Sequence, residues 1–208
     1  MTSSARFWDK IAPKYVAAPV RDTDAYAHTL DRTRAYLHQN DHVIELGCGS
    51  GTTAATLAPH VGHYLATDVS PKMIEYAQER AMNGPSWLEP AVMPADLPGI
   101  APASADVVLA FSLLHLVPDR GGVLRRVHEV LKPGGYFISK TVCLGGPGAL
   151  LFGPLIGAMR LFGKAPPVSL ITGDALEVEM AGAGFEIVEA GDHNRKPACR
   201  FVVARKAG

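Results

Sequence analysis

One stretch, residues 42–52 (HVIELGCGSGT), limits what this chain can fold into more than any other. An apolar run reaches Glu45 and then turns on Gly47, Gly49 and Gly51 before a helical pattern begins. Glycine suits such a turn because the chain reverses sharply and because a ligand can lie directly against the backbone. The free amides at the start of the next helix add polar groups there. The stretch therefore predicts a strand–turn–helix unit that binds a ligand at its turn.

A second strand pattern at 63–67 follows that helix and ends in Asp68. This position places a carboxylate at the tip of the neighbouring strand, where it can accept hydrogen bonds from a ribose diol. The glycines read G-x-G-x-G instead of G-x-G-x-x-G, so the pattern suited to a dinucleotide pyrophosphate is not met.

Strand and helix patterns alternate along the rest of the chain, which predicts one doubly wound α/β domain with a mostly parallel sheet. The last two strands are joined by a short polar connection at 190–198, so we expect them to be antiparallel. Further strands are expected at 87–92, 106–111, 136–141, 185–189 and 199–205, and helices at 52–61, 23–37, 119–131 and 172–181.

The bulk composition suits a globular enzyme: 208 residues, 48% hydrophobic, 19% charged and no formal net charge. A balanced charge gives no reason to expect nucleic acid as a partner. The three cysteines are far apart and form no C-x-x-C motif, and residues 1–7 lack an apolar signal core. We therefore expect reduced thiols, a cytoplasmic location and no metal site.

The glycine-rich stretch, taken with the downstream segments and the L-K-P-G-G turn at 131–135, resembles the class I S-adenosylmethionine-dependent methyltransferases. The similarity is closest to the small bacterial enzymes of the ubiquinone/menaquinone-methyltransferase type and runs from about Phe7 to Arg205. The resemblance implies a seven-stranded Rossmann-like sheet whose last strand is antiparallel. It also implies S-adenosyl-L-methionine as the cofactor.

Position and resemblance together suggest how the cofactor is held. The glycines allow close backbone approach, Asp68 accepts from the ribose hydroxyls, and Glu45 orients either the loop or the amino group of the cofactor. In the resembled family, Val69 and Met73 bracket the adenine. The expected cofactor-binding residues are Tyr15, Glu45, Gly47, Cys48, Gly49, Gly51, Asp68, Val69, Met73, Met93, Asp96, Phe111 and Ser112.

One segment departs from the family pattern. Met93 and Pro94 stand where the family places an aspartate and a small residue for the adenine amino group and ring nitrogen. Methionine is a weak acceptor and proline has no amide to donate. Either Asp96 serves the adenine, which we favour, or apolar contacts hold the base.

The chain begins with an aromatic phrase, FWDKIAPKY at residues 7–15. In the resembled family such a phrase covers the cofactor, with the tyrosine near its methionine end. We therefore expect residues 1–40 to form a helical lid and residues 41–208 to form the methyltransferase domain; the alternative is an N-terminal helix that only caps the core.

A loop with one histidine follows the strand at 106–111, and Phe111 and Ser112 should line the methionine side of the cofactor. His115 is the imidazole that this placement brings near the transfer centre, so it is our candidate general base. The alternative is a histidine that only braces the loop.

The regular alternation stops at 142–171, which is apolar on nearly all sides but rich in glycine and proline. Such a sequence is poor for one membrane-spanning helix. We expect it to form a wall of the substrate pocket; the alternative is a membrane-surface or dimer contact.

These features predict a methyltransferase that acts on a small, largely apolar or aromatic acceptor at oxygen, carbon or nitrogen, as a monomer or homodimer. Two other readings remain: a non-catalytic S-adenosylmethionine-binding or membrane-surface module, and an NAD-dependent oxidoreductase. The glycine spacing argues against the oxidoreductase.

Overall fold

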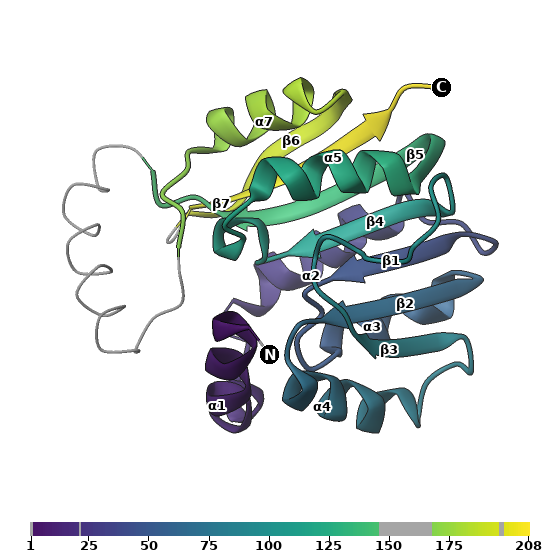
Figure 1. Cartoon of the computed structure of the whole chain (residues 1–208), viewed down its shortest axis with the longest axis vertical. Coiled ribbons are helices and arrows are strands. Elements are labelled where there is room, and N and C mark those ends of the chain that lie inside the picture. Colours follow the sequence, from purple (N-terminus) through teal and green to yellow (C-terminus); the bar gives the residue numbers. More distant parts are fainter. Residues whose placement is uncertain (1, 21, 146–167, 196–197) are drawn as a thin grey trace.

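The computed structural model describes residues 2–20, 22–145, 168–195 and 198–208. Its strands are β1 (His42–Leu46), β2 (His63–Asp68), β3 (Leu88–Val92), β4 (Ala105–Phe111), β5 (Leu131–Val142), β6 (Phe185–Arg195) and β7 (Ala198–Lys206). They form one seven-stranded sheet in the order β3-β2-β1-β4-β5-β7-β6 (Figure 1). Neighbouring strands are parallel except where β7 pairs with β5 and β6. The predicted fold class, with its antiparallel last strand, is confirmed.

Helices cover both faces of the sheet. They are α1 (Ser3–Ala17), α2 (Thr23–Arg34), α3 (Thr52–Leu57), α4 (Pro71–Ala81), α5 (Arg120–Val130) and α7 (Gly173–Gly182), with short 3₁₀ turns η1 (Ala58–His60) and η2 (Leu114–Leu116). Successive strand residues point to opposite faces. Phe137 therefore joins a core with α5 and α7, whereas Ile138 joins a second core with α2, α3 and α4.

Helix ends follow from local chemistry. Asp22 caps α2 by accepting from the Ala25 amide at 2.9 Å, and Ser70 caps α4 by accepting from the Met73 amide. The predicted helix at 52–61 is wrong in length: α3 ends at Leu57 and a 3₁₀ turn follows. Proline lacks an amide and disfavours helix in the residue before it, so Pro59 accounts for the change.

The largest differences from the expected strand boundaries are at β5 and at the last hairpin. The strand β5 starts at Leu131, which pairs with Ala105, and the chain then bulges over 132–135 before Tyr136 rejoins the ladder. The hairpin of β6 and β7 is longer than predicted, because strand pairing continues through the connection that we expected at 190–198.

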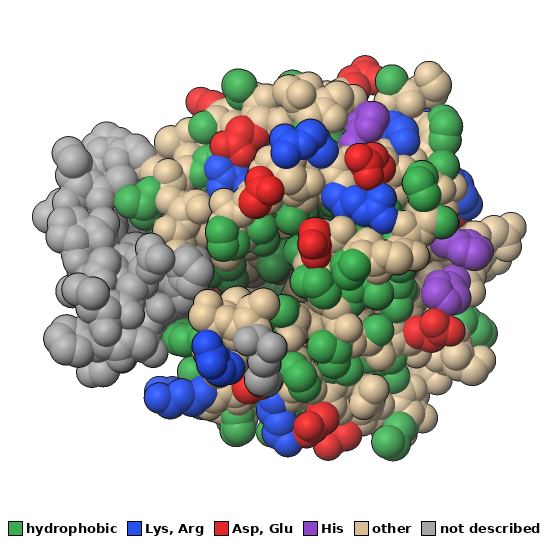
Figure 2. Space-filling view, in the orientation of Figure 1, with side chains coloured by type: hydrophobic (Ala, Val, Ile, Leu, Met, Phe, Trp, Pro, Cys, Tyr) green, Lys and Arg blue, Asp and Glu red, His purple; other side chains and the backbone are tan. Residues whose placement is uncertain are grey.

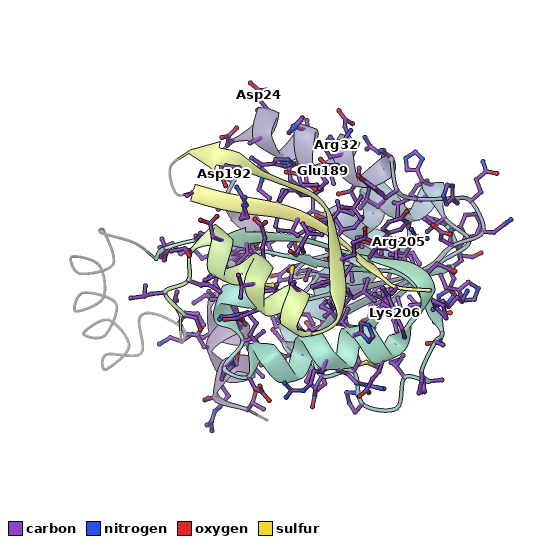
Figure 3. All side chains as sticks on the ribbon, turned by 90° about the horizontal axis from the view of Figure 1, so that it is seen from above. Asp24, Arg32, Glu189, Asp192, Arg205 and Lys206 are labelled. Carbon is purple, nitrogen blue, oxygen red and sulfur yellow. The ribbon has the colours of Figure 1, made fainter. Side chains whose placement is uncertain are left out.

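An ion pair holds α2 against the last hairpin. Arg32 donates to both carboxylate oxygens of Glu189, from Nε at 2.9 Å and from Nη2 at 2.6 Å, and the hydroxyl of Tyr36 donates to the same carboxylate at 2.7 Å. Figure 3 shows Arg32 and Glu189 side by side on these two elements. Bidentate pairs fix orientation as well as distance, so this contact sets where α2 lies over the sheet.

The predicted pocket wall at 142–171 falls mostly on residues 146–167, which lie outside the described residues. Of the helices that the structure does describe, none combines the length and the apolar character needed to cross a bilayer.

Candidate functional site

The glycine turn after β1 adopts a backbone that only glycine accommodates easily. Gly47, Gly49 and Gly51 have φ angles of +65°, +54° and +77°, in the left-handed region. A Cβ at Gly47 would lie 2.8 Å from Leu113 Cδ1, whereas one at Gly49 would meet only Tyr15 Cε1 at 3.8 Å. The backbone at Gly49 is therefore open to a ligand.

Gly51 has a different role from the other two glycines. A Cβ there would lie 2.9 Å from Ala77 Cβ and 3.0 Å from its Cα. Gly51 lines neither of the cavities described below. The position thus allows α3 and α4 to pack closely, and the structure does not bring this residue to the ligand-facing side of the turn.

Asp68 lies at the carboxyl end of β2, facing the glycine turn. Its Oδ2 accepts from the Gly49 amide at 3.0 Å and its Oδ1 from the Ser70 amide at 2.9 Å. Burial raises the pKa of Asp68, while the amides of Ser70 and Gly49 oppose that rise. A carboxylate oxygen can accept two hydrogen bonds, so each oxygen retains a site for a ligand hydroxyl.

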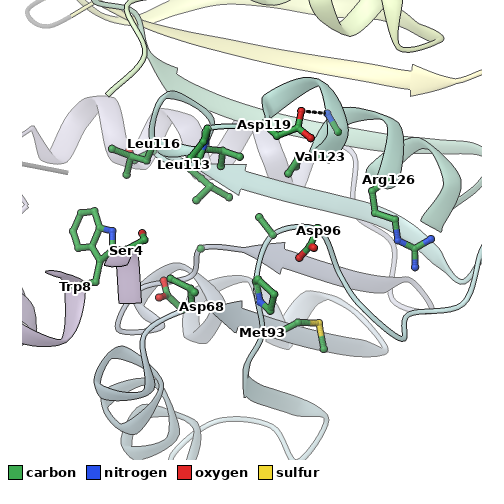
Figure 4. Close-up of a pocket in the computed structure, with 18 of the residues that line it drawn as sticks. Ser4, Trp8, Asp68, Met93, Asp96, Leu113, Leu116, Asp119, Val123 and Arg126 are labelled. Atoms are coloured by element: carbon green, nitrogen blue, oxygen red, sulfur yellow. Dashed lines mark hydrogen bonds between the residues drawn. The ribbon is translucent and has the colours of Figure 1, made fainter. Parts of the chain in front are cut away.

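A first cavity, here called cavity A, opens beside Asp68 at the carboxyl ends of the strands and has a volume of about 690 Å³. In Figure 4, Asp68, Met93 and Asp96 lie on one side of it, and Leu113 and Leu116 on the other. Figure 2 shows the corresponding hollow, lined mostly by hydrophobic side chains. Apolar walls with a few carboxylates suit a nucleoside.

A second cavity of about 500 Å³, here called cavity B, lies on the α2 and α3 side of the glycine turn. Its walls include Glu45 and Cys48 from the first strand and its turn, Tyr26 and Leu30 from α2, and Lys140 from β5.

The two cavities meet along a common boundary. The residues that line both are Tyr15, Gly47, Gly49, Phe111 and Ser112. Ligands of open α/β sheets bind beyond the carboxyl ends of the strands, where the strand order reverses, and here that point lies between β1 and β4. One elongated ligand can therefore place its nucleoside in cavity A and its other end in cavity B.

Glu45 forms part of the floor of cavity B. Its side chain is buried and Oε2 accepts a hydrogen bond from the Tyr64 hydroxyl at 2.9 Å. Burial raises the pKa of Glu45 to about 7; the Tyr64 hydrogen bond opposes this rise and the negative charge of Asp68 adds to it. A cationic group that binds beside this buried carboxyl group would stabilise its ionised form, so the site favours a cationic ligand group.

Other residues that the sequence predicts to bind the cofactor line one of the two cavities. Cys48 is buried, and burial together with the Glu45 and Asp68 carboxylates raises the pKa of its thiol well above the usual value. The thiol is therefore protonated and serves as a small wall residue. Val69 and Met73 line cavity A, and their contact with an adenine stays a prediction.

The segment that departs from the family pattern also lies in cavity A. Met93, Pro94 and Asp96 all line it, and the Met93 amide donates to the Asp68 carbonyl at 2.9 Å. The Met93 amide is therefore used within the protein. Asp96 remains the polar side chain of this segment that can reach an adenine, so its assignment stays a prediction.

His115 is not among the residues that line the two cavities. It is in η2 and only 9% exposed. Burial lowers its pKa to about 4, and its Nδ1 has no hydrogen-bond partner among the described residues. The structure thus does not bring His115 to the boundary, and its role as a base stays a prediction.

The N-terminal helix α1 borders cavity A. Ser4, Trp8 and Tyr15 line it, and Figure 4 shows Trp8 and Ser4 at its edge. Asp9 Oδ1 accepts from the Ser70 hydroxyl and from the Lys72 amide, the latter at 3.0 Å. This contact fixes α1 against the start of α4, and the role of α1 as a lid stays a prediction.

Sequence reasoning missed several cavity residues. They are Ser4, Trp8, Leu113, Leu116, Val123 and Arg126 in cavity A, and Tyr26, Thr29, Leu30, Arg80 and Lys140 in cavity B. The strand-end rule could have found Lys140, because it lies near the carboxyl end of β5, and also Leu113 and Leu116, because they lie in the loop that follows β4. The others depend on how the helices pack.

Comparison with known proteins agrees with this geometry. A family model described as a methyltransferase domain matches residues 44–139. An uncharacterised methyltransferase of Mycobacterium tuberculosis is 35% identical over 94 residues, which cover 45% of this chain and 46% of that protein. The 27-O-demethylrifamycin SV methyltransferase of Amycolatopsis mediterranei is 32% identical over 133 residues, which cover 62% of this chain and 47% of that protein. The chain thus spans about half the length of these relatives.

The fold is shared more widely than the sequence. A structure described as a putative methyltransferase from Bacillus halodurans superposes with a TM-score of 0.73 at 18% identity, covering 89% of this chain and 100% of that one. The sheet order, the glycine turn with Asp68 and the matched domain agree with one another. Residues 44–139 thus resemble a methyltransferase domain, and the described residues share the fold of that solved structure.

Proposed function

We propose that this protein transfers the methyl group of S-adenosylmethionine to a small, largely apolar or aromatic acceptor. The observation that carries the proposal is the meeting of cavities A and B at Tyr15, the glycine turn and Phe111. Such a boundary gives a cofactor and an acceptor one common point of approach. The methylated atom, whether oxygen, carbon or nitrogen, is left to experiment.

The residues of the site fit the cofactor. Asp68 keeps acceptor capacity for a ribose diol after binding the amides of Gly49 and Ser70. A side chain at Gly49 would project into the space near Tyr15, so glycine leaves that space open. Glu45 offers a carboxyl group to an ammonium group in cavity B.

When bound, the cofactor supplies a methyl group activated by a sulfonium. The work left to the protein is to align the acceptor with that methyl group and to exclude water, and alignment alone can contribute about 7–11 kcal/mol. Phe111 and Ser112 would set the direction of approach from the sheet side, and Tyr15 and Trp8 would cover the site from α1.

Calorimetric titration with S-adenosylmethionine, S-adenosylhomocysteine and NAD tests the proposal. We expect micromolar affinity for the first two ligands and none for NAD. Binding of NAD alone would instead indicate an oxidoreductase. Cofactor binding without methylated product from any small apolar or aromatic acceptor, combined with binding to lipid vesicles, would favour the non-catalytic module. Mass spectrometry of molecules that co-purify with the protein would name acceptor candidates.

A further inference from the structure

Lys140 lies next to the boundary between the two cavities. On the sheet it is in register with Phe111 of β4, and its carbonyl accepts from the Ser112 amide at 2.7 Å. Its side chain lines cavity B. The position of this cation is therefore fixed relative to the two residues that would direct the acceptor.

Lys140 and Glu45 both line cavity B but come from strands that are two apart in the sheet. Glu45 is in register with Leu109, and Leu109 with Ile138, two residues before Lys140. Residues in register on neighbouring parallel strands point to the same face of the sheet, and so do residues two positions apart on one strand. All four side chains therefore point to one face. Two strand spacings sideways and two residues along the strand separate the Cα atoms of Glu45 and Lys140 by about 12 Å. One ligand group at Glu45 thus leaves room for another at Lys140.

The ammonium group of Lys140 has neutral partners. Nζ donates to Thr29 Oγ1 at 3.0 Å and approaches the Ala25 carbonyl at 3.5 Å. Within the described part of the chain, no carboxylate oxygen lies within 4.0 Å of it. By contrast, Lys132 contacts both carboxylate oxygens of Asp106 at 2.8 Å. An ammonium has three donors, so Lys140 retains capacity for an anionic oxygen.

The electrostatic surroundings of Lys140 are mixed. Burial lowers the pKa of its ammonium group, while Cys199 on β7 and Asp22 before α2 oppose that change. On β6, His193 binds Thr29 Oγ1 at 3.0 Å and its pKa is lowered to about 4, chiefly by burial and also by His28 and Lys140. A half-buried cation without a close carboxylate gains most from an anion that enters the cavity.

Apolar and aromatic side chains also line cavity B. Val20, Leu30 and Phe111 line it, and the Tyr26 hydroxyl is engaged with Thr53 Oγ1 at 3.1 Å. A volume of about 500 Å³ admits an aromatic ring. We propose, building on the methyltransferase function above, that Lys140 determines acceptor specificity by binding an acidic oxygen, a phenolate or carboxylate, of a small aromatic acceptor.

The test measures binding of matched anionic and neutral probes. Benzoate and benzyl alcohol, and 4-nitrophenolate and nitrobenzene, are titrated against the protein with S-adenosylhomocysteine bound. We expect each anion to bind more tightly than its neutral partner. Lys140→Met should weaken anion binding about tenfold to hundredfold, the range for a charge-assisted hydrogen bond, and leave the neutral probes unchanged. Lys140→Arg should retain most of the affinity because it keeps the charge.

Lys206→Met is the matched control. Lys206 is also a sheet lysine with a neutral partner, since its Nζ donates to the Leu131 carbonyl at 2.8 Å, but it lines neither cavity. We expect this variant to bind all probes as the wild type does. Thermal unfolding of each variant confirms that it is folded.

Three results would overturn the lysine proposal. The wild type could bind no anion of the panel at about 10 mM, where even millimolar affinity is detectable. It could bind neutral and anionic probes equally, or Lys140→Met could retain the preference for anions. Failure of S-adenosylhomocysteine to bind would instead contradict the proposed function, and repeating the probe titrations without it keeps the two results separate.

Discussion

Glu45→Gln is the substitution whose consequences the structure defines most sharply. The carboxyl group is buried, with a pKa raised from 4.5 to about 7, chiefly by loss of solvation. A gap of about 2.5 units at about 1.4 kcal/mol per unit corresponds to about 3 kcal/mol against the ionised form in the folded state. Glutamine keeps the shape and can still accept from the Tyr64 hydroxyl at Oε1, but carries no charge.

The sign of the pH dependence follows from proton counting. Between pH 4.5 and 7 the folded protein keeps a proton on Glu45 that the unfolded chain has released. The contribution of this group to stability is therefore full below pH 4.5 and is lost as the pH rises past 7. We expect Glu45→Gln to be more stable than the wild type by about 3 kcal/mol at pH 8 and equal to it at pH 4.

Urea denaturation of both proteins across this pH range measures the difference, in which the other titrating groups cancel. A stability difference that does not change with pH would refute the reasoning, because it would mean that Glu45 titrates alike in the folded and unfolded states.

The same carboxyl group tests where the cofactor lies. An ammonium group beside Glu45 would lower its pKa, so at pH 7, where the group is about half protonated, S-adenosylhomocysteine should release about half a proton per site. Calorimetry in two buffers of different ionisation enthalpy measures this release, and Glu45→Gln should abolish it. If the wild type released no proton, Glu45 would not bind the ammonium group of the cofactor, and its role would be to orient the loop.

Three further substitutions test other parts of the site. Asp68→Asn should weaken S-adenosylhomocysteine binding about 10- to 100-fold by calorimetry, because an amide loses the charge and one acceptor oxygen; unchanged affinity would remove the ribose assignment. Gly51→Ala should cost about 2–4 kcal/mol of stability in urea, from a positive φ and a clash with α4, whereas Gly182→Ala, with open space around it, should be neutral or stabilising; equal effects would contradict the packing argument. Asp9→Ala should speed hydrogen exchange in α1 and weaken cofactor binding; a change in neither would disconnect α1 from the site.

The part of the site that was predictable from sequence lies where strands end. Residues such as Asp68 and Phe111 were found because each directly follows or closes an apolar strand, and parallel strands bring these ends to one edge. Gly51 was also recognised, but the sequence could not show that it faces α4 and not the ligand. That distinction depends on the packing of two helices separated by a whole strand.

Contacts between residues that are far apart in the chain could not be predicted from the sequence. Asp9 meets Ser70 across 61 positions, and Lys140 meets Thr29 across 111. Neither contact belongs to a short motif, and both depend on where α1 and α2 lie over the sheet. The ion pair of Arg32 with Glu189, which helps set that place for α2, spans 157 positions.

Lys140 and His115 imply two different ways in which an acidic acceptor can lose its proton. The conjugate acid of His115 has a pKa of about 4, so this imidazole is a weak base at neutral pH, and it lines neither cavity. An acceptor that binds to Lys140 as an anion arrives already deprotonated and needs no base. If Lys140 acts in this way, His115→Ala should turn over as fast as the wild type at every pH, and Lys140→Met should lose turnover mainly at pH values below the pKa of the acceptor. A loss of turnover in His115→Ala that grows as the pH falls toward 4 would restore the histidine as the base.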